Sequence, residues 1–169
     1  MADERIIHIE WSGPHSLAEV DAFRDRRRDR GLYQIYGHHP VYGPNVLLYI
    51  GQTDLTFGER IPGENWGGGS IEDPQNVEVY VGRLKGPATP SRDEWRREIC
   101  LAERLLIHAH GPAYNSTNIM AVAQRDQEAR KTRVLNWGCF RSLHREVSGL
   151  LWIQYQQFTE YKIYEASTE

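Results

Sequence analysis

Residues 31–52 read GLYQIYGHHPVYGPNVLLYIGQ, and this stretch decides the fold that we expect for the chain. Segments 31–37 and 46–52 are rich in tyrosine, isoleucine, leucine and valine, which favour strands. Segment 38–45 lies between them and holds two prolines and a glycine, so it predicts a long hairpin loop. We therefore expect two neighbouring strands joined by a hairpin.

Further strands are predicted on both sides of this hairpin. Residues 77–84 alternate between apolar and polar side chains and predict a third strand. Residues 5–11 also read as a strand, which we expect Ser12-Gly13-Pro14 to break. Residues 53–75 read as a loop around a short helical turn near residues 55–60.

Two helices announce their starts with capping boxes. Ser16 is followed three residues later by Glu19, and Ser91 by Glu94. The first helix is predicted to run into the arginine-rich residues 24–30 and to stop at Gly31. The second is predicted to run to about residue 110, before a Gly-Pro pair. Later in the chain we expect a helix over 121–131, a short strand over 133–136 and a helix over 142–158.

Length and composition limit the class of protein. The chain has 169 residues, of which 40% are hydrophobic and 25% charged, so we expect one globular domain over residues 1–169. No run approaches the ~18 apolar residues needed to span a bilayer, and no secretory signal is recognisable. Cys100 and Cys139 form neither a disulfide framework nor a metal spacing, and we expect both to be small buried side chains. A cytoplasmic protein with no organic cofactor and no membrane contact fits these features best.

The overall charge does not announce a nucleic-acid partner, but the distribution of arginine allows one. The formal net charge is −3, and only three of the 20 basic residues are lysines. Arginine binds phosphate with a planar fork of donors, although a genome rich in arginine codons explains the bias equally well. Arginines cluster within residues 24–30, 92–97 and 125–133. From these clusters Arg28 and Arg96 are candidates for contact with a phosphate backbone, while a solvated helix end is the competing interpretation of the first cluster.

Glu103 is the most informative residue of the long predicted helix. The positions four residues away on either side are Ile99 and Ile107, so Glu103 lies on or beside the apolar face. A buried carboxylate is costly unless a cation, a set of donors or a metal compensates it. Considered alone, this helix favours an ion pair with a nearby arginine, such as Arg96 or Arg104.

Two triplets in the hairpin shift the interpretation of Glu103 from an ion pair toward a functional role. Gly31-Leu32-Tyr33 followed by Tyr49-Ile50-Gly51 resembles the paired motif of the GIY-YIG nucleases, with leucine in place of the first isoleucine. The 15 residues between the two triplets make the hairpin longer than in compact members of that family. Taken singly, each tyrosine is more easily explained as a packing residue.

Three further matches follow in the order that the family shows. Arg60 stands where the family carries an arginine on the helix after the second strand. Glu103 fits the glutamate of a later helix, and Pro112-Ala113-Tyr114-Asn115 matches a Pro-x-Tyr/Phe-Asn element. The resemblance covers about residues 30–116, with residues 1–29 and 117–169 as extensions. The chain departs from the family after Arg60, where Pro62 and Gly63 end the helix at once and leave no histidine or lysine beside the arginine.

The resemblance implies an α/β fold, namely a small, mainly antiparallel three-stranded sheet flanked by helices and extended by the terminal segments. It also implies a metal-dependent endonuclease that hydrolyses DNA. Glu103 would hold one Mg²⁺ or Mn²⁺, since a single carboxylate with waters suits a hard octahedral cation. Arg60 would clamp the scissile phosphate and favour the phenolate of Tyr33, the general base.

The remaining family residues would support that chemistry. Tyr49 would position water or phosphate, and Asn115 would orient Glu103 or a backbone group. Gly51 would allow the substrate backbone to come close, with Arg28 and Arg96 as further contacts. Cutting both strands with one such site would favour a homodimer.

Two other classes of function remain open. The chain could be a nucleic-acid-binding module on the same fold that has lost its activity. It could also be a structural or interaction protein that shares only the small sheet. The complete set of tyrosines, arginine, glutamate and asparagine argues against the former, and a glutamate on an apolar helix face argues against the latter.

Overall fold

The computed structural model describes residues 4–63, 76–117 and 127–150 of the chain. Its elements follow one another in this order: β1 (Arg5–His15), α1 (Leu17–Asp21), β2 (Gly31–His39), β3 (Gly43–Thr53), α2 (Phe57–Arg60), β4 (Glu78–Lys85), α3 (Arg92–His110), α5 (Gln127–Arg130), β5 (Thr132–Gly138) and β6 (Glu146–Ser148).

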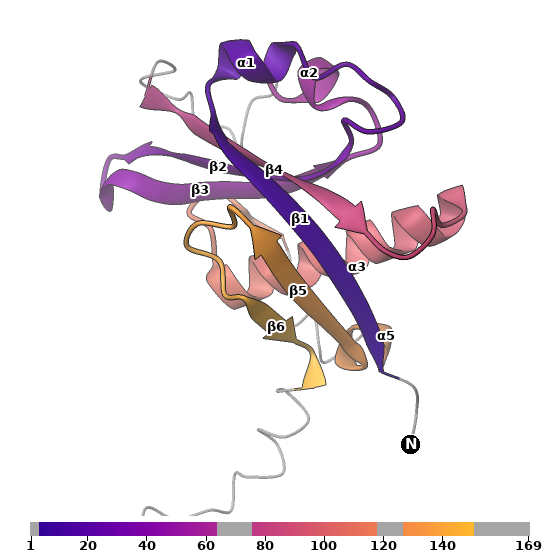
Figure 1. Cartoon of the computed structure of the whole chain (residues 1–169). Helices are drawn as coiled ribbons and strands as arrows, with labels where there is room; N and C mark the ends of the chain where they lie inside the picture. The colour runs from indigo at the N-terminus through magenta and orange to yellow at the C-terminus, as the bar shows by residue number, and fades with distance from the viewer. Residues whose placement is uncertain (1–3, 64–75, 118–126, 151–169) are drawn as a thin grey trace, which may run out of the picture.

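All six strands belong to one mixed sheet, in the order β3-β2-β4-β1-β5-β6. Neighbouring strands are antiparallel except β1 and β5, which run parallel. The sheet is strongly twisted and curls into a half-barrel, with α3 across one of its faces (Figure 1). The expectation of a small three-stranded sheet flanked by helices is therefore wrong. The terminal segments, treated as extensions in the sequence, supply β1, β5 and β6, which are half of the sheet.

The boundaries of β1, β2 and β3 also differ from those expected. β1 does not end at Ser12-Gly13-Pro14 but continues to His15 and absorbs the break as a shift in its pairing with β4. The hairpin is longer in strand and shorter in loop than expected, because β2 reaches His39 and β3 begins at Gly43. The predicted long hairpin loop is thus a short turn.

The helical predictions fare unevenly. Ser16 and Glu19 do form the capping box, but α1 ends at Asp21, so the arginine-rich residues 24–30 form a loop. α2 begins with a further capping box between Thr56 and Glu59. α3 starts after Ser91, whose hydroxyl accepts from the amide of Glu94, and ends before Gly111-Pro112 as predicted.

The predictions for the last third of the chain are partly outside the described residues. β5 confirms the strand expected over 133–136. Of the helix expected over 121–131, residues 121–126 lie outside the described residues, and residues 127–130 form α5. The helix expected over 142–158 is wrong at its start, where β6 is a strand, and its part beyond residue 150 lies outside the described residues.

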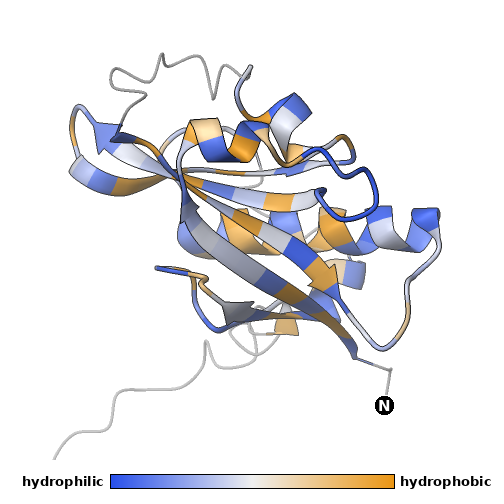
Figure 2. Ribbon diagram, turned by 45° about the horizontal axis from the view of Figure 1, so that its top comes forward, coloured by the Kyte–Doolittle hydropathy of each residue, from blue (hydrophilic) through white to orange (hydrophobic). Residues whose placement is uncertain are grey.

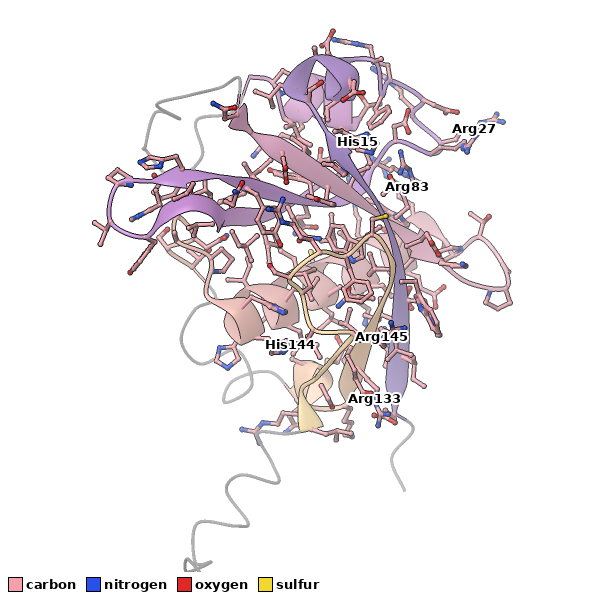
Figure 3. All side chains as sticks on the ribbon, turned by 60° about the vertical axis from the view of Figure 1, so that its left-hand side comes forward. His15, Arg27, Arg83, Arg133, His144 and Arg145 are labelled. Atoms are coloured by element: carbon pink, nitrogen blue, oxygen red, sulfur yellow. The ribbon has the colours of Figure 1, made fainter. Side chains whose placement is uncertain are left out.

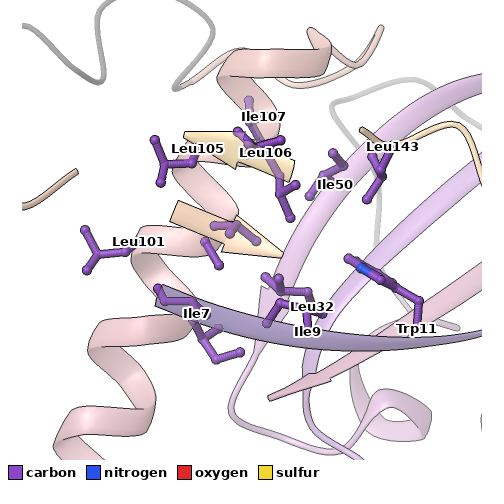
Figure 4. Packing of buried hydrophobic residues seen from close by; sticks show 14 of the residues in the cluster. Ile7, Ile9, Trp11, Leu32, Ile50, Leu101, Leu105, Leu106, Ile107 and Leu143 are labelled. Carbon is purple, nitrogen blue, oxygen red and sulfur yellow. The ribbon is translucent and has the colours of Figure 1, made fainter. Parts of the chain in front are cut away.

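Alternation along the strands gives the sheet a core on each face. On one face, apolar side chains of β1, β2 and β3 form a buried cluster with side chains of α3, among them Leu106 and Ile107 (Figure 4). On the other face, the smaller helices α1 and α2 cover a second cluster that includes Tyr33, Phe57 and Val81. The two faces therefore carry separate groups of candidate site residues. In Figure 2 residues 24–30, in the loop between α1 and β2, are hydrophilic, in contrast to both clusters.

Candidate functional site

The two motif tyrosines lie side by side on the face of the sheet that α1 and α2 cover. Tyr33 of β2 pairs in register with Gly51 of β3, and Tyr49 lies two residues before that glycine. Their ring centroids are 6.0 Å apart, with an angle of 32° between the planes. Tyr33 is only 1% exposed, whereas Tyr49 is half-buried. The more accessible phenol of the pair therefore belongs to Tyr49.

Gly51 is the point at which the two rings meet. A β-carbon built on it would lie 2.6 Å from the hydroxyl of Tyr33 and 2.6 Å from Cε1 of Tyr49. No side chain fits at that distance, so the position requires glycine. The other motif glycine, Gly31, has φ +144° and faces the carbonyl of Gly82 across the sheet, which also excludes a side chain. Gly31 thus allows the backbone of β4 to come close, and Gly51 allows the two tyrosine rings to come close.

Asn115 fixes the backbone of the second triplet. Its Oδ1 accepts a hydrogen bond of 2.9 Å from the Ile50 amide, and its Nδ2 donates one of 2.9 Å to the Ile50 carbonyl. The side chain is 6% exposed, so both bonds are shielded from water. Of the two targets foreseen for Asn115, Glu103 or a backbone group, the structure shows the backbone group.

Glu103 approaches the same end of β3 from the opposite face. It is half-buried on α3, and its Oε2 accepts a hydrogen bond of 2.9 Å from Nε2 of Gln52. Gln52 directly follows Gly51, and successive strand residues point to opposite faces. The phenols and the carboxylate therefore flank neighbouring residues of one strand. β3 is the last strand at this edge of the sheet.

Gln52 is a residue that sequence reasoning missed. It also lies 3.2 Å from Sγ of Cys100, one turn before Glu103 on α3. The signal was its position directly after the Tyr-Ile-Gly triplet, because strand alternation predicts that it faces away from the tyrosines and toward a helix. Cys100 and Cys139 are both exposed, contrary to expectation.

Arg60 lies at the end of α2, on the tyrosine side of the sheet. Phe57 and Ile61 flank it in sequence and pack in the same buried cluster as Tyr33, while Arg60 itself is exposed. The capping box at Thr56 sets the start of this single turn. The local fold therefore turns the apolar side of α2 toward the tyrosines and leaves the arginine at the surface.

The two other candidate arginines lie near α3 and behave differently. Arg96 donates to Oδ2 of Asp54 at 2.6 Å, and this hydrogen bond lowers the pKa of the Asp54 carboxyl. Asp54 follows β3, so the pair ties α3 to the end of the motif strand. Arg28 is exposed on the loop before β2, and its carbonyl accepts a hydrogen bond from Arg83.

A resident metal ion would rest on few protein ligands. Among the described residues, no three or more histidine, cysteine, aspartate and glutamate side chains come together as a metal cluster. A single glutamate with waters is nevertheless an adequate donor set for Mg²⁺, which keeps most of its hydration shell in proteins. Glu103 fits that requirement, because Gln52 donates to one of its oxygens and so fixes the carboxylate as an outer-sphere partner does.

Comparison of the chain with protein-family models, with curated proteins and with solved structures returned no match. None of the helices within residues 4–63, 76–117 and 127–150 combines the length and apolar character that crossing a membrane needs.

Proposed function

We propose that the chain is a metal-dependent endonuclease that hydrolyses phosphodiester bonds of DNA at the end of β3. The observation that carries the proposal is the packing of Tyr33 and Tyr49 against Gly51, next to a strand residue that binds Glu103. Phenols, a carboxylate and the exposed Arg60 are the groups that phosphodiester hydrolysis by this chemistry requires. The resemblance of the two triplets to the GIY-YIG motif supports the same assignment.

Within this proposal each residue has its own part. Tyr33, in its phenolate form, accepts the proton of the attacking water, and the hydroxyl of Tyr49, the more accessible of the two, orients water or the phosphate. Arg60 donates charge-assisted hydrogen bonds to the phosphate oxygens. Glu103 would hold Mg²⁺ or Mn²⁺, which supplies charge stabilisation at the phosphate and at the departing oxygen. Gln52 and Asn115 are positioning residues for the carboxylate and the strand.

Nicking of supercoiled plasmid with Mg²⁺ or Mn²⁺ tests the proposal, with EDTA as the control for the metal. Glu103→Gln keeps the side-chain volume and should lower the nicking rate at least about 100-fold, the scale of one electrostatic contact to a transition state. Asp93→Asn, an exposed acid on the same helix, should leave the rate unchanged. Equal rates for wild type and Glu103→Gln would reject the proposed site.

The tyrosines are tested with a matched set of phenylalanine variants. Tyr33→Phe and Tyr49→Phe remove only a hydroxyl and should each lower the nicking rate at least about 10-fold. Tyr42→Phe is the control, because Tyr42 lies 68% exposed in the turn between β2 and β3. If all three variants nick at the same rate, the phenols have no chemical part.

A second candidate function is a DNA-binding module without cleavage. The observation that favours it is the near-complete burial of Tyr33, since a general base must reach a water molecule. DNA retention that weakens with salt, with no nicking under any divalent cation, would identify this function.

A further inference from the structure

A second feature of the surface is a cleft of about 740 Å³ at the N-terminal end of α3. The loop between α1 and β2 forms one wall, the end of β4 with the segment after it forms another, and the first turns of α3 close it. Five basic side chains line the cleft, against two carboxylates, Glu94 and Glu98; the basic residues are Arg27, Arg28, Arg30, Arg83 and Lys85. The lining therefore carries an excess of three positive charges in a chain whose net charge is −3.

Hydrogen bonds from β4 and α2 hold the loop between α1 and β2 in place. Arg83 of β4 donates to the carbonyl of Arg28 at 3.0 Å and to Oδ1 of Asp29 at 2.8 Å. Asp29 in turn accepts from the backbone amide of Phe57 through its carbonyl. The amide of Asp25 donates to the Asp29 carboxylate, which closes the loop on itself. A loop fixed in this way presents its side chains with little further loss of entropy on binding.

Four of the five arginines of the loop divide into two pairs, and the fifth, Arg30, lies over the ring of Trp95. Within the described residues, the side chains of Arg27 and Arg28 make neither a hydrogen bond nor an ion pair, and Figure 3 shows Arg27 extending away from the ribbon near Arg83. Arg24 and Arg26, by contrast, do not line the cleft. Arg24 pairs with Asp21, and Arg26 pairs with Glu59 at 3.3 Å. Two guanidinium groups thus remain available to a ligand in the cleft.

The acidic side of the cleft is partly neutralised. Glu98 accepts from Arg5 at 3.4 Å, and burial raises the pKa of its carboxyl. The aromatic rings that line the cleft are already engaged: Arg30 covers Trp95, with its Cζ 4.6 Å from the ring centroid, and His8 stacks on Trp137. The cleft therefore offers charge to phosphates, and its two aromatic rings are each in contact with another side chain.

The cleft and Glu103 share helix α3. Trp95 and Glu103 are eight residues apart on α3, which corresponds to ~12 Å along the helix axis. Each DNA strand carries one phosphate per ~3.4 Å of helix axis, so this separation is about three to four base pairs.

We propose that this cleft binds the sugar-phosphate backbone of DNA, three to four base pairs from a phosphate held near Glu103, without reading base sequence. The choice of DNA as ligand rests on the proposed function. Arg27 and Arg28 make the phosphate contacts, while Arg83 is a positioning residue for their loop. Binding of this kind depends strongly on salt and little on sequence.

Fluorescence anisotropy with a labelled 25-base-pair duplex in EDTA tests the proposal without cleavage. Arg27→Ala/Arg28→Ala should raise the Kd about 10-fold or more and reduce the slope of log Kd against log salt by about 2, the expectation for two lost phosphate contacts. Arg24→Ala/Arg26→Ala removes the same charge from the same segment outside the cleft, and should change the Kd less than about 2-fold. Circular dichroism checks that both variants fold.

Three results would overturn the proposal. One is an unchanged Kd in Arg27→Ala/Arg28→Ala, and another is an equal loss in both double variants, which would indicate diffuse charge alone. The third is displacement of the duplex by tripolyphosphate at micromolar concentration in wild type, which would identify a free polyphosphate as the ligand. If wild type nicks DNA but Arg27→Ala/Arg28→Ala binds the duplex as tightly as wild type, the cleft proposal fails and the nuclease proposal stands. If binding depends on the cleft but wild type does not nick DNA, the nuclease proposal fails and the cleft proposal stands.

Discussion

At the scale of single residues, the candidate site depends on a glycine at position 51. Gly51 has no β-carbon, and the space that one would occupy is filled by the hydroxyl end of Tyr33 and the edge of Tyr49. The contact between the rings and the strand therefore exists only for glycine. This makes Gly51 a positioning residue for both phenols, independent of any contact that it makes with substrate.

Gly51→Ala should separate the tyrosines and destabilise the fold. The added methyl group would lie 2.6 Å from both rings, and Tyr33 is buried, so relief requires movement of packed side chains. Overpacking of this kind costs about 1–3 kcal/mol. Urea unfolding measures the loss, and the nicking rate should fall with it. Gly63→Ala is the control, because a β-carbon there meets nothing within 4 Å; equal loss in both variants would contradict the explanation.

Some residues of the site could be found from sequence and others could not. Tyr33, Tyr49 and Asn115 stand within recognisable triplets or elements, and the structure brings all three to β2 and β3. Gln52 has no motif of its own and becomes visible only once α3 is known to cross the strand. Gln34 is a similar case: it is completely buried on β2 and accepts from the hydroxyl of Tyr36, and no periodic pattern predicts a buried glutamine there.

At the scale of elements, the exposed edge of β3 is covered by the segment that follows α3. The amide of Ala113 donates to Leu47, that of Tyr114 donates to Leu48, and the Asn115 side chain completes the row at Ile50. An uncovered edge strand invites pairing with other chains. The Pro-Ala-Tyr-Asn element therefore acts as a partial extra strand, which gives it a structural reason to accompany the Tyr-Ile-Gly triplet.

Asn115→Ala should open this edge at one point. It leaves the amide and the carbonyl of Ile50 without their partner, and each unsatisfied buried group costs about 1–3 kcal/mol. We expect a loss of about 2–4 kcal/mol in the free energy of unfolding and faster hydrogen exchange at the Ile50 amide. Ser116→Ala, an exposed neighbour, should change neither quantity. Protection of the Ile50 amide that survives in Asn115→Ala would show that the side chain is dispensable to the edge.

Element boundaries were the weaker part of the sequence prediction, for a definite reason. The helix starts at Ser16 and Ser91 were read correctly, because they depend on two residues at fixed spacing, although the complete capping box is seen at Ser16 and only the bond from the Glu94 amide to the hydroxyl is seen at Ser91. The length of α1 was not, because arginines favour helices intrinsically but here Arg83 holds the segment as a loop. Tertiary contacts, those of Arg83 and of the Phe57 amide among them, thus hold these seven residues as a loop.

At the scale of the whole molecule, the sheet is assembled from segments that are distant in sequence. β1 joins β4 on one side and β5 on the other, and the β1–β5 pair links residue 5 to residue 132. Such pairings leave no local pattern, which is why the sheet was expected to have three strands although strands were also predicted at 5–11 and 133–136. The parallel pair in particular needs the long connection that includes α3, and no hairpin signal marks it.

His110 connects α3 to the segment between β5 and β6, and it should make the free energy of unfolding depend on pH. Nδ1 of its ring lies 2.8 Å from the Leu106 carbonyl on α3, and Nε2 accepts from the backbone amide of His144, in the segment between β5 and β6. The acceptor role requires a neutral ring. Burial lowers the pKa of His110 below its usual value, and the nearby His144 lowers it further.

Since the folded pKa is depressed, the unfolded chain binds the proton first as pH falls. Stability should be complete above the ordinary pKa of 6.5 and decline as pH drops below it, by at most about 1.4 kcal/mol per pH unit for this proton. Urea unfolding between pH 8 and pH 5 measures the decline. Burial also lowers the pKa of His15, which therefore contributes to the decline in the same direction. His110→Gln should remove its share of the slope. His144→Gln retains the backbone donor and should keep most of the slope, so identical pH profiles for wild type and His110→Gln would show that the ring's neutrality does not hold α3 to the segment between β5 and β6.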